Sequence, residues 1–176
     1  ETFKNRSHYY RKKDHKRIYS ICPIYVNGKI LDFKRIFKIA KKYNLKIIND
    51  CAGSFLSVMK NKNILKYSDI SISSFNGNKC PSAGMGGCAI TNNRKYSKFI
   101  ENFCENFSTK IKYLHSYYGY NCRITNLHAS LLFSELRYLK ETITKKNKIY
   151  EFYLRNIKVN NKIKIYTKKK NEVIWV

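Results

Sequence analysis

The chain has 176 residues, enough for one domain with a hydrophobic core, and its 43% hydrophobic content argues against a disordered protein. Its longest apolar runs are too short to cross a membrane and its N-terminus lacks a signal peptide's apolar core, so we expect a cytoplasmic protein. Lysine and arginine number 36 against 11 acidic residues, a net charge of +25 that suits a nucleic acid or an acidic substrate such as a sugar nucleotide. The basic residues are spread along the whole chain, so a biased composition explains the charge equally well.

The first third of the chain predicts a βαβ unit. After an irregular basic lead-in over residues 1–16, we expect a strand at Arg17–Cys22, a helix over Asp32–Asn44 and a strand at Leu45–Asn49. Asp32 is the expected N-cap of the helix. A strand, a helix and a strand at this spacing imply parallel strands joined by a right-handed crossover.

The middle of the chain predicts two more strands and a helix. The strands are expected at Ser68–Ser74 and Cys88–Thr91, on either side of a glycine-containing loop, and the helix begins at Asn93. A tyrosine-rich loop follows over Ser108–Ile124.

The last third predicts one long helix and two short strands. The helix runs from Thr125 to about Tyr153, with a break expected at Lys145–Lys148. The alternation in Val159–Val176 predicts the strands.

The cysteines do not form a metal-binding pattern. The chain has six, with no C-x-x-C pair and no histidine at ligand spacing. Several lie in apolar surroundings, so we expect reduced, structural cysteines and no metal site.

The stretch SISSFNGNKCPSAGMGG, Ser71–Gly87, predicts a ligand-binding loop. A strand leads into a tight polar turn, Lys79 follows the turn at once, and the later glycines allow close approach of the backbone to a ligand. Such a lysine suits a covalent Schiff base once it is partly desolvated. A surface hairpin carrying one of many lysines is the alternative interpretation of this pattern.

Asp50 stands at the carboxyl end of a predicted strand, where open α/β sheets bind their ligands. A carboxylate there could pair with a protonated ring nitrogen of a cofactor. The alternative is an N-cap for a helix over Cys51–Met59.

Three motifs together resemble one enzyme family. SSFNGNK followed by GMGG, NDCAGS at Asn49–Ser54 and GYNCRITNLHAS at Gly119–Ser130 are similar, in the same order, to motifs of the DegT/DnrJ/EryC1/StrS aminotransferases, which use pyridoxal 5'-phosphate (PLP). The resemblance is greatest to the branch that aminates nucleotide-linked sugars on the way to legionaminic acid or bacillosamine.

The resemblance implies an α/β fold, the central part of the large domain of a fold-type I PLP-dependent transferase, with a mostly parallel sheet and flanking helices. It implies that Lys79 holds PLP covalently and moves protons, that Asp50 keeps the ring nitrogen protonated, and that Ser74 holds the phosphate. Asn121 would reach the phosphate from the partner of a homodimer, and His115 would lie near the substrate. The substrates would be a nucleotide-linked keto-sugar and an amino donor, glutamate.

The resemblance also implies that the chain is a fragment. Residues 17–156 would form part of the PLP-binding large domain, and 157–176 the start of the small C-terminal domain. The family's phosphate-binding turn, which lies upstream in other members, has no counterpart here, and Gly53 stands where many members have a polar cofactor contact. We therefore expect weak PLP binding and no useful turnover.

Two alternatives to an active aminotransferase remain. The charge and the 15% aromatic content also suit a basic nucleic-acid-binding domain, although the chain carries no motif of that class. A folded, non-catalytic remnant of an aminotransferase is the other.

Overall fold

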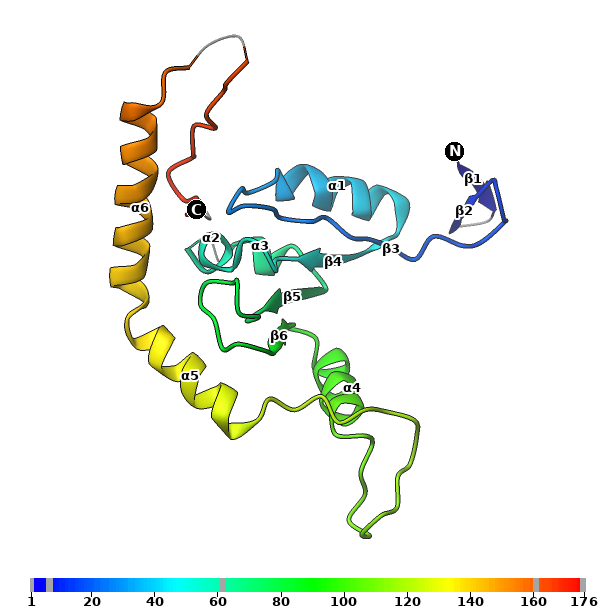
Figure 1. Ribbon diagram of the computed structural model, residues 1–176. Coiled ribbons are helices and arrows are strands. Elements are labelled where there is room, and N and C mark those ends of the chain that lie inside the picture. Colours follow the sequence, from blue (N-terminus) through cyan, green and yellow to red (C-terminus); the bar gives the residue numbers. More distant parts are fainter. Residues whose placement is uncertain (1, 6–7, 61–62, 160–161, 175–176) are drawn as a thin grey trace.

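A computed structural model describes residues 2–5, 8–60, 63–159 and 162–174. A four-stranded sheet lies at the centre, in the order β3-β4-β5-β6 (Figure 1). The strands are β3 (Ser20–Ile21), β4 (Lys46–Asp50), β5 (Ile70–Ser74) and β6 (Gly87–Ile90). β3, β4 and β5 are parallel and β6 is antiparallel to β5, so the predicted α/β fold with a mostly parallel sheet is confirmed.

The predicted βαβ unit is confirmed. Helix α1 (Phe33–Tyr43) connects β3 to β4 and packs against β4. Asp32 caps it, since its carboxylate accepts the backbone N–H of Arg35 at 3.0 Å, and Asn44 ends it in the left-handed conformation, with φ of 51°. β3 and β4 pair in parallel, with Ile21 opposite Ile47.

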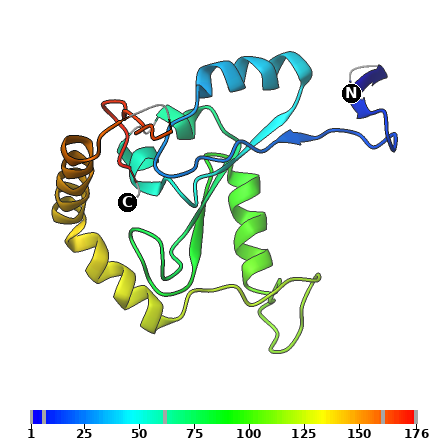
Figure 2. The same ribbon diagram turned by 45° about the horizontal axis from the view of Figure 1, so that its top comes forward.

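The hydrophobic core lies beside the sheet, where two short helices, α2 (Phe55–Lys60) and α3 (Asn63–Lys66), meet the loop that precedes α1. The buried members of this core are Tyr25, Ile30, Cys51, Val58 and Ile64. Figures 1 and 2 show these helices on the side of the sheet that α6 and the C-terminal segment approach.

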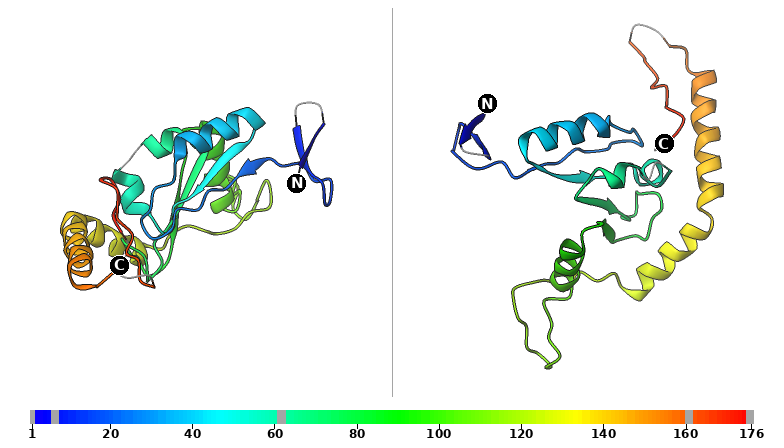
Figure 3. Two further views of the ribbon diagram at one scale, coloured as in Figure 1. Left: turned by 90° about the horizontal axis from the view of Figure 1, so that it is seen from above. Right: turned by 180° about the vertical axis from the view of Figure 1, so that it is seen from behind.

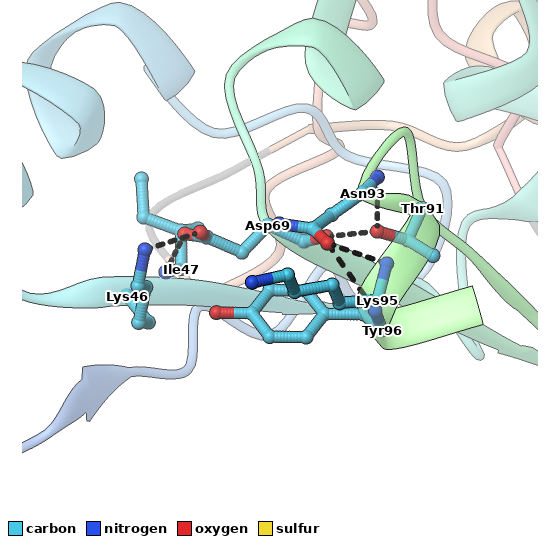
Figure 4. A network of polar contacts seen from close by, with 7 residues as sticks. All are labelled: Lys46, Ile47, Asp69, Thr91, Asn93, Lys95 and Tyr96. Carbon is cyan, nitrogen blue, oxygen red and sulfur yellow. Dashed lines mark hydrogen bonds and ion pairs between the residues drawn. The ribbon is translucent and has the colours of Figure 1, made fainter. Parts of the chain in front are cut away.

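A polar network lies at the end of the sheet opposite Asp50 (Figure 4). The Asp69 carboxylate accepts the backbone N–H of Ile47 at 2.9 Å and pairs with the Lys46 amine at 3.1 Å. The Thr91 hydroxyl donates to the Asp69 carbonyl at 2.6 Å and accepts the backbone N–H of Asn93 at 3.1 Å. The network therefore ties β4, β5 and β6 to one another and to the start of the next helix.

Helix α4 (Arg94–Cys104) begins as predicted, because the Asn93 side chain accepts the backbone N–H groups of Lys95 and Tyr96. After α4 the chain forms an extended loop that projects away from the sheet, visible at the bottom of Figure 1. Among the described residues, no helix is both long and apolar enough to span a bilayer.

The position of the predicted helix break is wrong. The chain forms α5 (Asn126–Arg137) and α6 (Leu139–Asn156), separated at Tyr138, whose φ of −96° and ψ of 13° leave the helical range. The run Lys145–Lys148 lies inside α6. Lysine is a good helix former, and like-charge neighbours cost an exposed helix only a few tenths of a kcal/mol, about 0.2–0.5 per pair.

The expected strands in Val159–Val176 are also wrong for the part that the structure describes, where residues 162–174 form no strand. Their backbone groups pair with side chains instead of with another strand. Lys168 N–H donates to the Tyr150 hydroxyl at 3.0 Å, and Val173 N–H donates to the Ser57 hydroxyl at 2.8 Å. Residues 175–176 and 160–161 lie outside the described residues.

The irregular lead-in expected over residues 1–16 is wrong for residues 2–5 and 8–11, whereas residues 12–16 form no helix or strand. β1 (Thr2–Asn5) and β2 (His8–Arg11) form an antiparallel hairpin, with Phe3 opposite Tyr10. The rings of these two residues stack with centroids 5.4 Å apart, a cross-strand aromatic pair that stabilises such hairpins. In all views the hairpin and α6 lie at opposite ends of the molecule (Figures 1, 2 and 3).

Candidate functional site

The loop after β5 is held closed by backbone hydrogen bonds. Phe75 is buried; its N–H donates to the Gly86 carbonyl at 2.9 Å, and its carbonyl accepts the N–H of Ala83 at 2.8 Å. Lys79 follows a tight turn in which its own N–H donates to the Asn76 carbonyl at 2.8 Å. These bonds anchor the lysine-bearing turn to the end of the sheet.

Lys79 is half-buried and lines a small pocket with about 290 Å³ of empty volume. That volume includes open solvent, and the space that the centre of a water-sized sphere can occupy is only about 20 Å³, far below the range of about 300–1,000 Å³ for small-molecule sites. The other lining residues come from the turn and helix start after β4, from the lysine loop, from α6 and from the C-terminal segment: Ala52, Gly53, Ser54, Phe55, Leu56, Cys80, Lys146, Val173 and Ile174.

Asp50 lies at the carboxyl end of β4, beside β5, with Ile72 as its register partner. Its Oδ1 accepts the Ala52 N–H at 3.0 Å, and the chain runs from there directly into the wall of the Lys79 pocket. Among the described residues no donor is hydrogen-bonded to Oδ2, so this oxygen can accept from a ring N–H. The carboxylate therefore lies at the end of β4, and the lysine on the loop that follows its parallel neighbour β5, at the same end of the sheet.

The donor set at this end of the sheet suits PLP: an amine on a closed loop, a carboxylate at a strand end, and the hydroxyl of Ser74 at the end of β5. Ser74 is half-buried, and its hydroxyl oxygen accepts the Asn76 N–H at 3.3 Å. The resemblance to the family also implies that the Asp50 carboxylate and the Lys79 amine face one cleft, about a pyridine ring's width apart, and this stays a prediction.

The thiols nearest the site are not nucleophiles at neutral pH. Burial first, and then the neighbouring Asp50 carboxylate, raise the pKa of Cys51 to about 12. Burial also raises the pKa of Cys80, against the opposing charge of Lys146. The amines of Lys79 and Lys146 are therefore the candidate nucleophiles that line the pocket.

The structure brings the glycine loop against the segment that carries GYNCRITNLHAS. A Cβ on Gly86, where φ is +100°, would lie 3.1 Å from Ile124 Cδ1, and one on Gly84, where φ is +78°, would lie 3.7 Å from His128. Both segments line one groove, to which the second segment also contributes Cys122, Arg123 and Thr125. Two of the three motifs thus meet in space.

His115 and Asn121 lie elsewhere, on the projecting loop. His115 Nδ1 is hydrogen-bonded to the Asn106 carbonyl at 2.7 Å and lines a separate cavity with residues 116–119. Asn121 is exposed and pairs with Glu105 across an isolated antiparallel bridge. Within this chain these residues are not among those that line the Lys79 pocket.

Sequence reasoning missed Lys146, which α6 brings to the Lys79 pocket. It lies in the lysine run that predicted a helix break, so no local signal distinguishes it from its neighbours. The docking of Val173 and Ile174 at the same pocket was also missed, because it depends on contacts with Ser57 far away in the chain.

Tyr25 is another residue whose position the sequence did not predict. It is only 1% exposed and lies in the core that supports the site. Burial is the main cause that raises the pKa of its hydroxyl to about 12. Among the described residues, this hydroxyl has no hydrogen-bond partner. Its backbone is well paired: its N–H donates to the Asp50 carbonyl and its carbonyl accepts the Ser54 hydroxyl. Tyr25 therefore supports the turn after Asp50 through its main chain.

Comparison with known proteins agrees with the motifs. The profile of the DegT/DnrJ/EryC1/StrS aminotransferase family matches residues 11–176. GDP-perosamine synthase of Escherichia coli O157:H7 is 31% identical over 153 residues, which are 86% of this chain and 42% of that protein. A dTDP-3-amino-3,6-dideoxy-alpha-D-galactopyranose transaminase of Aneurinibacillus thermoaerophilus is 31% identical over 142 residues, 81% of this chain and 39% of that one.

Comparison with a solved structure also shows similarity to a protein that binds the cofactor PMP. The crystal structure of NtdA from Bacillus subtilis, with its bound cofactor PMP, superposes with a TM-score of 0.66 at 29% identity and covers 78% of this chain and 31% of that one. The chain spans about 40% of the length of the curated relatives that it matches.

Proposed function

The chain belongs to the DegT/DnrJ/EryC1/StrS aminotransferase family, and from that premise we propose that it is part of a PLP-dependent aminotransferase of nucleotide-linked keto-sugars. The family match and the sugar transaminases among the relatives support the reaction class. The proposal rests on the position of Lys79. This lysine is half-buried in a pocket whose wall begins at Ala52, two residues after Asp50.

PLP, when bound, supplies an electron sink that makes the α-hydrogen of an amino acid acidic. In the proposed site Lys79 binds the cofactor covalently and moves a proton to and from the α-carbon of the amino donor, glutamate. The free Oδ2 of Asp50 holds the proton on the pyridine nitrogen. Ser74 donates its hydroxyl to the phosphate.

The remaining contacts come from other parts of the assembly. We propose a homodimer in which Asn121 of a second copy reaches the phosphate and His115 lies near the sugar. The projecting loop supports this, since its tyrosines are exposed in the single chain: Tyr118 is 91% and Tyr113 is 84% exposed. Tyrosine-rich exposed surfaces are typical of protein interfaces.

Lys146 adds a second lysine side chain to the pocket wall. We propose that it contacts an anionic group of the cofactor or of the bound donor.

We also propose a division of the chain into two domains. Residues 17–156 are part of the large domain, and residues 157–176 begin the small C-terminal one.

A nucleic-acid-binding function is not favoured. The family match spans residues 11–176, and the relatives named above are sugar transaminases. The net charge of +25 is compatible with a phosphorylated cofactor and a nucleotide-linked substrate.

An absorbance titration with PLP tests the proposal. We expect weak binding, with a new absorbance band in the wild type that is lost in Lys79→Ala and kept in Lys38→Ala, a matched change of an exposed lysine on α1. Borohydride reduction followed by peptide mapping should place the pyridoxyl label on Lys79. A label spread over surface lysines, or a band that survives Lys79→Ala, would overturn the assignment. Glutamate-dependent amination of keto-sugar nucleotides then measures how much activity the chain has.

A further inference from the structure

Two cysteines face each other where the projecting loop leaves and rejoins the fold. Cys104 is the last residue of α4, and Cys122 follows the loop. The Cys122 N–H donates to the Cys104 carbonyl at 2.9 Å, and the Asn106 N–H donates to the Tyr120 carbonyl at 3.1 Å. These bonds flank the antiparallel bridge between Glu105 and Asn121, so the cysteines are directly opposite each other.

The separation of the two residues suits a disulfide. Residues opposite each other in antiparallel strands have Cα atoms about 4.5–5.5 Å apart. Disulfides join Cα atoms separated by about 4.4–6.8 Å, a range that includes this separation. The two side chains are neighbours, since the Cys122 side chain contributes to the raised pKa of the Cys104 thiol.

The two thiols differ in exposure. Cys122 is exposed and Cys104 is half-buried. Burial first, and then the Cys122 side chain, raise the pKa of the Cys104 thiol. Cys122 therefore meets an oxidant from solvent first, and Cys104 is positioned to react second.

We propose that Cys104 and Cys122 are an oxidation site at which a peroxide converts the two thiols into an intrachain disulfide. The Cys122 thiolate attacks one peroxide oxygen, the O–O bond breaks, and hydroxide leaves and takes up a proton to become water. Cys104 sulfur then attacks the sulfenic acid of Cys122, an S–S bond forms, and a second water leaves. Both sulfurs are oxidised by one electron each and the peroxide is reduced to two waters.

The disulfide would close the loop of residues 105–121 at its base. The bridge residue Asn121 is next to Cys122, and Gly119 packs so closely on the end of α4 that a Cβ there would lie 2.8 Å from the Phe103 carbonyl. Closing the base limits the movement of this segment. The inference does not rest on the proposed function, although in that function Asn121 is the residue most directly affected.

The other cysteines provide the controls. Cys22 is exposed and Cys51 is buried. Cys22→Ser therefore removes an exposed thiol without touching the pair.

Mild hydrogen peroxide treatment of the full chain, followed by alkylation and non-reducing peptide mapping, tests the inference. We expect a cross-linked peptide containing Cys104 and Cys122, a loss of two alkylatable thiols per chain, and recovery of both with dithiothreitol. Cys22→Ser keeps the cross-link, and Cys104→Ser and Cys122→Ser each lose it. Amide hydrogen exchange of residues 105–121 should slow on oxidation of the wild type and return on reduction.

Three results would overturn the inference. One is a wild-type chain in which both thiols stay alkylatable under conditions that oxidise Cys22. The second is over-oxidation of Cys122 with Cys104 still free, and the third is a cross-link between two chains. Because these readings use the wild type, a variant that folds poorly does not decide the outcome.

Discussion

The buried carboxylate of Glu172 accepts the backbone N–H of Ile30 at 2.7 Å, across 142 residues of sequence. It also accepts the N–H of Lys169 at 2.7 Å and the hydroxyl of Tyr166 at 2.8 Å. A side chain only 1% exposed thus fastens the C-terminal segment to the loop before α1. Val173 and Ile174, which line the Lys79 pocket, follow it directly.

Removing this carboxylate should destabilise the fold. Glu172→Ala leaves the buried amide of Ile30 without an acceptor, at a cost of about 1–3 kcal/mol, and also removes the acceptor of the Lys169 amide. Urea denaturation measures the loss. Glu151→Ala is the control, because Glu151 is exposed and its ion pair with Arg155, at 3.9 Å, should contribute less than about 0.5 kcal/mol. Equal stability of the two variants would contradict the prediction.

The contribution of Glu172 should depend on pH. Burial raises the pKa of its carboxyl group, but the amides of Ile30 and Lys169 and the Tyr166 hydroxyl outweigh burial, so the folded pKa lies below the usual 4.5. A lowered folded pKa gives stability that is fully present above the unfolded pKa and is lost as the pH falls through the folded value. Urea midpoints of wild type and Glu172→Gln should therefore converge on acidification below about pH 4.5. A gap that is constant down to acid pH would count against the ionised carboxylate.

Gly28 should be irreplaceable. Its φ is +80°, and a Cβ there would lie 1.9 Å from the backbone oxygen of Val173, which cannot move aside cheaply. The left-handed backbone alone costs an alanine about 1–2 kcal/mol, and the clash adds to it. Gly77→Ala is the matched control, since its nearest contact would be 3.8 Å away. Thermal melts should show a large loss for Gly28→Ala and a small change for Gly77→Ala.

Asp69 should matter far more than the lysine that pairs with it (Figure 4). Asp69→Ala removes the acceptor of the Ile47 amide and should cost about 1–3 kcal/mol. Lys46→Ala removes only an ion pair whose lysine is 60% exposed, worth about 0–1 kcal/mol. If urea denaturation ranks the two variants the other way, the ion pair and not the amide bond holds this end of the sheet.

Lys146 should contribute to cofactor binding without touching the chemistry. Lys146→Met removes a charge from the wall of the Lys79 pocket and should weaken PLP binding about tenfold, as expected for one charge-assisted hydrogen bond. Lys148→Met makes the same change at an exposed position of α6 and should leave the dissociation constant unchanged. Equal titration curves for the two variants would remove Lys146 from the site.

Patterns of a few neighbouring residues determined much of this protein. Short apolar, β-prone runs predicted β3, β4, β5 and β6, and the helical spacing with Asp32 as N-cap predicted α1, because these preferences act within a turn or a strand. Short connections then made the parallel pairing of β3 and β4 predictable. Three short motifs were enough for the family, with Lys79 and Asp50 among their residues.

Contacts between distant residues decided the rest. Whether residues 162–174 form strands depended on acceptors and donors at Glu172, Tyr150 and Ser57, which replace a neighbouring strand. Lys146 reaches the Lys79 pocket only because α6 continues through its lysines, and Cys104 meets Cys122 only because a long loop returns to the end of α4. Local propensity carries no information about which of several similar side chains such packing selects, and that selection is made by the tertiary structure.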